Sequence, residues 1–141
     1  FGRYRLLDLI ISRLAGIKAD TETSLTERSP LQRYDDADPK LRQRWEDELA
    51  AAIEAEYRRE RSDLVLSLQW WLRDVWLRTL ACGAEVLAFP DLEAETGSVA
   101  GRLAAADSLQ NLETIEHAQR LLGTNVQEAL ALEVSFLKLR L

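Results

Sequence analysis

The sequence predicts an all-α protein built as a bundle of five or six helices. Apolar residues recur every three or four positions over most of the chain, and no stretch alternates with the period of two that is typical of strands. Only six Gly and three Pro interrupt the 141 residues. Apolar residues make up 47% and charged residues 30%, as in globular proteins. A chain of this length can bury roughly two thirds of its unfolded surface, so we expect one helical domain.

The first helix is expected within residues 1–16, because its apolar residues share one face and Gly16 suits a helix end. Those apolar residues are Leu6, Leu7, Ile10, Ile11 and Leu14. Residues 17–37 lose this periodicity and collect Thr, Ser, Asp and Glu around Pro30, which predicts a flexible loop that is longer than most connections. Residues 38–141 then form the main helical bundle.

The bundle is predicted to begin with Asp38 as N-cap and Pro39 at the first helical position. A single apolar stripe follows, in which one residue in every four is apolar: Leu41, Trp45, Leu49, Ile53 and Tyr57. Beyond Arg61 the chain becomes apolar on most faces, which indicates that it enters the core. The pattern allows one helix over 39–81 or two helices, since Ser62 could cap a second start. In either case Gly83 follows its end.

Two further helices are expected before the last one. Asp91 is the predicted N-cap of the first, which should be weak or bent because Gly97 and Gly101 each cost about 1 kcal/mol relative to alanine. Asp107 or Ser108 is predicted to cap the next helix, which ends at Gly123.

Residues 125–141 predict a closing helix that is apolar on two sides. Asn125 and Glu128 have the spacing of a capping box. One apolar stripe contains Leu130, Val134, Leu137 and Leu141, and the second contains Leu132, Phe136 and Leu139. One stripe should pack into the chain's own bundle and the other should lie at a subunit boundary. The sequence leaves open which stripe does which.

The charge distribution disfavours direct nucleic-acid binding. The formal net charge is −6, and residues 84–119 carry seven acidic residues against Arg102 alone. Surfaces that bind nucleic acids gather Lys and Arg instead. No run approaches the roughly eighteen apolar residues of a membrane span, and no signal segment opens the chain. Cys82 is the single cysteine, which is compatible with a reducing cytoplasm, where we expect the protein to reside.

Motifs for catalysis are missing from the sequence. It contains no phosphate-binding loop, dinucleotide fingerprint, HExxH zinc motif or GxSxG nucleophile elbow. His117 is the single histidine and has no metal-ligand partners at suitable spacing. We therefore expect no catalytic, cofactor-binding or metal-ligating residues, and the chain is not expected to be an enzyme.

A tryptophan-rich segment is the most distinctive stretch. Trp70, Trp71 and Trp76 surround Arg73 and Asp74. Successive helical residues diverge by about 100°, so these three indoles cannot all point to one inward face. At least one of them should reach a second helix layer, a charged side chain or another chain.

This segment also carries a resemblance to a known family. LQWWLRDVWL at 68–77, FPDL at 89–92 and NV at 125–126, followed by LALE at 130–133, together resemble the C-terminal collar domain of bacterial DNA polymerase III clamp-loader subunits. The resemblance covers residues 62–141. Its W-L-R-D element favours the delta-prime subunit, and the LALE element is shared with gamma/tau, the alternative.

The resemblance implies an assembly role. Collars of this family pack into a ring with those of other clamp-loader subunits, and an AAA+ module would lie upstream of Phe1. The chain would thereby support sliding-clamp loading in DNA replication. The candidate subunit-interface residues are Trp70, Trp71, Arg73, Asp74, Trp76, Asn125, Leu130, Leu132, Glu133 and Phe136. A stand-alone helical regulatory or small-ligand-binding domain, with the tryptophan helix as a pocket wall, is the alternative function.

Overall fold

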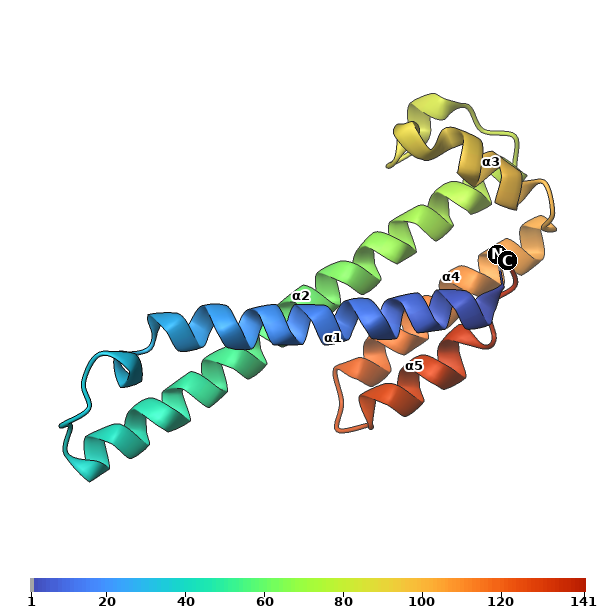
Figure 1. Cartoon of the computed structure of the whole chain (residues 1–141). Coiled ribbons are helices and arrows are strands. Elements are labelled where there is room, and N and C mark those ends of the chain that lie inside the picture. Colours follow the sequence, from blue (N-terminus) through green and yellow to red (C-terminus); the bar gives the residue numbers. More distant parts are fainter. Residues whose placement is uncertain (1) are drawn as a thin grey trace. The chain divides into compact units, whose positions relative to one another are not determined.

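A computed structural model describes residues 2–141 and confirms the all-α prediction (Figure 1). Five α-helices and no strands occur in this part of the chain. The elements are α1 (Arg3–Arg28), η1 (Pro30–Gln32), α2 (Pro39–Thr79), η2 (Ala84–Val86), η3 (Pro90–Leu92), α3 (Glu93–Ala100), α4 (Ala105–Leu122) and α5 (Glu128–Phe136). Within residues 2–141 no helix is both long and apolar enough to cross a membrane.

The chain divides into two compact units. Residues Ser12–Asp63 form one, which we call the hairpin unit. Residues up to Ile11 together with Leu64–Leu141 form the other, which we call the C-terminal unit. Both α1 and α2 contribute residues to each unit. The expected ranges 1–16, 17–37 and 38–141 do not coincide with these units.

The predicted helix end at Gly16 and the flexible loop 17–37 are wrong, because α1 continues to Arg28. Ile17 and Thr21 are buried, and they extend the spacing of three and four residues that earlier buried positions of α1 follow. The cost of about 1 kcal/mol for a helical glycine is small beside the burial of two further side chains. The sequence did not indicate this continuation, because most of the exposed positions between Gly16 and Arg28 carry polar or charged residues.

α2 is one helix of 41 residues, which decides the question that the sequence left open. It ends at Thr79 through a Schellman motif, in which the N–H of Cys82 donates to the carbonyl of Leu77 at 3.1 Å. The N–H of Ala81 donates to the Arg78 carbonyl, also at 3.1 Å. Ala81 has φ = 60°, the left-handed conformation that glycine usually supplies. The helix therefore ends before Gly83 is reached.

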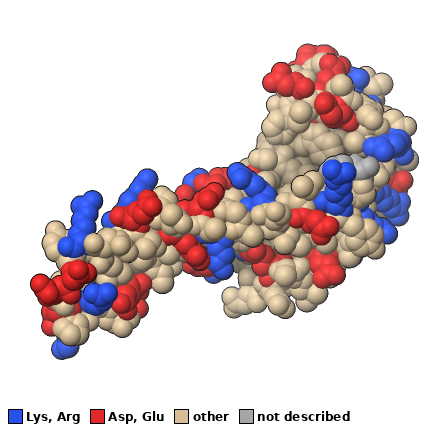
Figure 2. All heavy atoms as spheres, viewed as in Figure 1, with Lys and Arg blue, Asp and Glu red and all other residues tan. Residues whose placement is uncertain are grey.

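The hairpin unit pairs the later part of α1 with the first part of α2. Leu14 and Ile17 of α1 are buried in it, as is Tyr57 of α2, over whose ring the Lys18 ammonium lies at 6.0 Å. Charges of both signs mix along the surface of this unit (Figure 2). On α2 they form ion pairs such as Arg58–Glu54 at 2.7 Å. Such exposed pairs contribute a few tenths of a kcal/mol each.

The C-terminal unit holds the larger core, in which α4 and α5 pack together. Its most deeply buried large side chains are Val65, Leu72, Val75, Ile115, Leu132, Phe136 and Leu139. The predicted end of α4 at Gly123 is confirmed, since this glycine is its C-cap.

The predicted caps of the middle helices are wrong. Asp91 lies inside η3, and α3 begins after Leu92, whose side chain makes no capping bond. α4 has Ala104 as N-cap, so that Asp107 and Ser108 fall within its first turns. Asp107 instead pairs with the side chain of Arg140. Neither helix start has a side-chain cap.

The closing helix is shorter than expected. α5 covers Glu128–Phe136, with Gln127 as N-cap, so the Asn125 capping box is wrong. The reason for its early end is the buried side chain of Asn111. Its Nδ2 donates to the carbonyl of Arg140 at 2.6 Å, and its Oδ1 accepts from the Arg140 N–H at 2.9 Å. Residues 137–141 therefore lie outside any helix, and Arg140 is bonded to α4 through Asn111.

Candidate subunit interface

The three tryptophans of α2 have different surroundings, as their spacing requires. The Trp71 indole is half-buried and donates from Nε1 to the Oγ1 of Thr96 at 3.1 Å. Thr96 is fully buried, so this bond attaches α3 to α2. Trp70 is exposed, and the Arg73 guanidinium lies over its ring at 5.4 Å. Trp76 is half-buried.

Asp74 has a structural role inside the C-terminal unit. Its buried carboxylate accepts the backbone N–H groups of Ala88 and Phe89 at 2.9 and 2.8 Å. Arg73 donates to the same carboxylate at 3.3 Å and to the Val86 carbonyl at 3.2 Å. The W-L-R-D element thus fastens the segment before η3 onto α2.

The two apolar stripes of the closing segment have separate roles. Leu132 is 2% exposed and Phe136 is fully buried, so their stripe packs into the C-terminal unit. Leu130 is 53% exposed and Val134 is 45% exposed on the other side of α5. The prediction that one stripe packs into the bundle is confirmed, and the structure identifies which one. Leu130 and Val134 form a surface that we call the outer face of α5.

The candidate interface residues therefore fall into three groups. Asp74, Leu132 and Phe136 belong to the interior, which corrects their assignment to a contact surface, because buried side chains have no free area for a partner. Trp71, Arg73 and Trp76 are half-buried. The exposed members are Trp70, Asn125, Leu130 and Glu133.

Trp70 and Arg73 share a groove between α2 and α4 with residues that the sequence analysis did not single out. This groove has a volume of about 210 Å³, and Leu66 and Leu112 line it as well. Leu66 precedes Trp70 by one helical turn, a spacing that could have identified it as part of the same face. The sequence could not have shown that α4 forms the other side of this groove, because that depends on tertiary packing.

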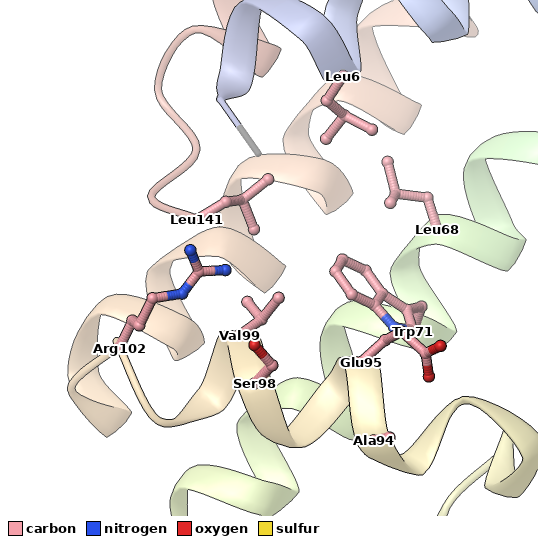
Figure 3. Close-up of a pocket in the computed structure, with 9 residues that line it drawn as sticks. All are labelled: Leu6, Leu68, Trp71, Ala94, Glu95, Ser98, Val99, Arg102 and Leu141. Atoms are coloured by element: carbon pink, nitrogen blue, oxygen red, sulfur yellow. The ribbon is translucent and has the colours of Figure 1, made fainter.

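A larger pocket of about 570 Å³ lies beside α3 (Figure 3). Most of its lining is apolar, and we call it the α3 groove. The lining residues are Leu6, Leu68, Trp71, Ala94, Glu95, Ser98, Val99, Arg102 and Leu141. Only Trp71 among them was a predicted site residue.

Acidic side chains surround the groove on the α3 side. Figure 2 shows Asp and Glu gathered over this part of the C-terminal unit. Asp91, Glu93 and Glu95 are exposed there. Among these acids, Glu93 lies 3.7 Å from the Arg78 guanidinium. A partner that covers this surface is expected to bring basic side chains.

The described residues, 2–141, contain no cluster of His, Cys, Asp and Glu that could hold a metal ion. His117 is exposed on α4, and Cys82 is half-buried just after α2. Two pKa values in the hairpin unit are clearly displaced. There a hydrogen bond from Arg59 lowers the pKa of Glu56 below its usual value of 4.5. The same contact raises the pKa of Arg59.

Comparisons of the chain with protein-family models, with curated proteins and with solved structures find no match. The assignment of function therefore depends on the residues themselves and on the surfaces that they form.

Proposed function

We propose that this chain is a subunit-assembly domain, the collar, of a bacterial DNA polymerase III clamp loader. In this role it supports sliding-clamp loading during DNA replication. The observation that carries the proposal is the outer face of α5. A surface helix normally turns polar residues to water, whereas Leu130 and Val134 lie one turn apart and are about half exposed. Such a face suits burial against another subunit.

The resemblance to clamp-loader collars supplies the family. LQWWLRDVWL and LALE are its main elements, and the residues of both elements support a scaffold in this structure. Asp74 and Trp71 attach the η3–α3 region to α2, while Leu132 anchors α5. A scaffold of this kind can present the outer face of α5 in a defined orientation.

The proposed parent protein is the delta-prime subunit, with gamma/tau as the alternative. Its partners are the other clamp-loader subunits, and its AAA+ module lies upstream of Phe1. The chain works in the cytoplasm without cofactor or catalysis. Because residues 84–119 carry a net charge of −6, as large as that of the whole chain, DNA contacts belong to other parts of the assembly.

Mixing the chain with purified subunits of a bacterial clamp loader tests the proposal. We expect co-elution in size-exclusion chromatography, and we expect the double variant Leu130→Ser/Val134→Ser to lose it while its melting temperature stays unchanged. Leu41→Ser is the matched control, because Leu41 is 40% exposed in the hairpin unit and its loss should leave co-elution intact. Full co-elution of the double variant would remove the outer face of α5 from the interface.

The coding sequence upstream of Phe1 provides a second test. An AAA+ module there is the expected result. A start codon close to Phe1 would contradict the clamp-loader assignment.

One observation favours the alternative function of a stand-alone regulatory or small-ligand-binding domain. The α3 groove has a volume in the usual range of ligand pockets, and Trp71 forms part of its wall. Binding of a small apolar compound such as octanol, without any complex formation with clamp-loader subunits, would support this alternative.

A further inference from the structure

The α3 groove has walls that are held in place by buried hydrogen bonds. Trp71 and Leu68 of α2 form one wall, and α3 forms the next through Val99 and Ser98 (Figure 3). The bond from Trp71 to buried Thr96 fixes these two walls relative to each other. The groove is therefore a preformed feature of the C-terminal unit on this side.

The remaining wall is fixed in a similar way. Leu141 belongs to the segment that Asn111 holds through two hydrogen bonds to the backbone of Arg140. Leu139 in the same segment is 1% exposed, which anchors it further. Arg3 adds a hydrogen bond to the carbonyl of Leu137 at 3.0 Å. The wall that carries Leu141 is thus tied to both α4 and α1.

Two charged residues of opposite sign line the groove. Glu95 lies on the side of Trp71, and Arg102 lies on the side of Leu141 (Figure 3). Neither side chain forms an ion pair or hydrogen bond with any residue in 2–141. Glu95 lies in the first turn of α3, and Arg102 lies just beyond its C-cap, Gly101. The apolar part of the groove lies between them.

This pattern selects among possible occupants. Both charged side chains are exposed. A purely apolar small molecule would therefore use neither charge for binding, and a singly charged amphiphile would pair with only one. A helix can fill the apolar groove and also pair with both charged residues, because residues at i, i+3, i+4 and i+7 lie on one face. A basic residue and an acidic residue seven apart can flank two apolar anchors there.

We propose that the α3 groove binds a helical segment of a partner protein. This segment places apolar side chains against Trp71 and Val99, a Lys or Arg against Glu95, and an Asp or Glu against Arg102. The carboxylate can accept two parallel hydrogen bonds from the Arg102 guanidinium. The inference goes beyond the proposed function, since it holds whichever assembly the chain joins and uses a surface other than the outer face of α5.

A synthetic helical peptide of fifteen residues is a direct probe, with Lys at position i, Leu at i+3 and i+4, Glu at i+7 and Ala or Gln elsewhere. Binding to the 141-residue chain is followed by NMR through the indole N–H signal of Trp71. We expect this signal to shift on titration. A peptide with both leucines replaced by Asn should give no shift.

Charge reversal tests the orientation of the contacts. Replacing the peptide's Lys by Glu should weaken binding roughly tenfold, as the ion pair with Glu95 becomes a repulsion. The Glu95→Lys variant of the chain should recover the affinity for that peptide. Because Glu95 is exposed, this variant is expected to keep the fold.

Three results would overturn the inference. The first is the absence of any shift at Trp71 with the complementary peptide, and the second is equal affinity for the two charge forms. The third is that octanol binds the groove and the complementary peptide fails to displace it, which would assign the pocket to a small ligand. The Leu130→Ser/Val134→Ser variant should bind the peptide normally, so failure here is distinguishable from failure of the clamp-loader assignment.

Discussion

At the scale of single residues, buried polar side chains organise the C-terminal unit. Asp74, Thr96 and Asn111 are all at most 1% exposed, and each bonds to a group far from it in sequence. A buried polar group costs free energy unless it is hydrogen-bonded. These residues therefore specify where α3, the segment before η3 and the segment after α5 must lie.

Replacing Asp74 by alanine is expected to lower the free energy of unfolding by about 1 to 3 kcal/mol, because the N–H groups of Ala88 and Phe89 lose their acceptor. Urea unfolding followed by circular dichroism measures this change. Asp74→Asn keeps one carbonyl acceptor and should cost less. Equal losses for the two variants would mean that the two hydrogen bonds contribute little.

Ala81 offers a stabilising substitution. Its left-handed backbone costs an L-residue about 1 to 2 kcal/mol, so Ala81→Gly should raise the free energy of unfolding by about 1 kcal/mol. Ala50→Gly is the matched control. Ala50 is exposed in the interior of α2, where glycine should destabilise by about 1 kcal/mol. Changes of the same sign in thermal unfolding would refute the assignment of the Schellman motif.

The Glu56–Arg59 contact gives the hairpin unit a small contribution to stability that depends on pH. Because the pKa of Glu56 is lower in the folded chain than its usual 4.5, its contribution to stability is present above pH 4.5. It is lost as the pH falls through the lowered pKa. We expect Glu56→Gln to melt at a lower temperature than the wild type at neutral pH and at the same temperature in acid. A pH-independent difference would contradict this linkage.

At the scale of elements, α5 combines a core face and an outer face on nine residues. Leu132→Ala is expected to cost about 2 to 5 kcal/mol, since the side chain is almost fully buried. Leu130→Ala should change the free energy of unfolding by at most about 0.5 kcal/mol. Denaturant unfolding of both variants checks the pair. Similar losses at the two positions would mean that the outer face contributes to the chain's own core.

The helix ends show which boundaries a local sequence pattern can predict and which it cannot. α4 ends at Gly123 as predicted, because a glycine after a periodic segment is a local signal. α1 passes through Gly16 because Ile17 and Thr21 find buried positions beyond it. The apolar run after residue 136 predicts more helix, yet the backbone of Arg140 bonds to Asn111 instead. Such competition involves residues far apart in sequence.

At the scale of the whole molecule, the chain offers contact surfaces of different character. The outer face of α5 is aliphatic, whereas the α3 groove is an apolar pocket flanked by charges of opposite sign in a region rich in acidic residues. In the hairpin unit, by contrast, the surface of α2 carries exposed ion pairs. We therefore expect protein partners to contact mainly the C-terminal unit.

The Asn111→Ala variant tests how the segment after α5 is held. Loss of its two hydrogen bonds should release residues 137–141 and remove the Leu141 wall of the α3 groove. Hydrogen exchange at the Arg140 amide is expected to accelerate, and the complementary peptide should bind more weakly. Amides near the middle of α4, such as that of Ala118, serve as the control and should keep their protection. Unchanged exchange at Arg140 would show that burial of Leu139 alone holds the segment.

Local sequence patterns predicted the all-α class, the presence of helices over most of the chain, and the change from an ionic first part of α2 to an apolar second part. These properties follow from local periodicity, which each helix carries in its own residues. The tryptophan-rich segment that contains Asp74 was also recognisable from the sequence as its most distinctive stretch.

Three features required the folded chain to be seen: which apolar stripe of the closing segment is buried, where that helix ends, and which residues line the α3 groove. Burial depends on what packs against a face, and the hydrogen bonds of Asn111 and Asp74 join positions 29 and up to 15 residues apart. Leu132 and Leu130 are both leucines on one short helix. Their different roles arise because only one side of α5 meets the core of the C-terminal unit.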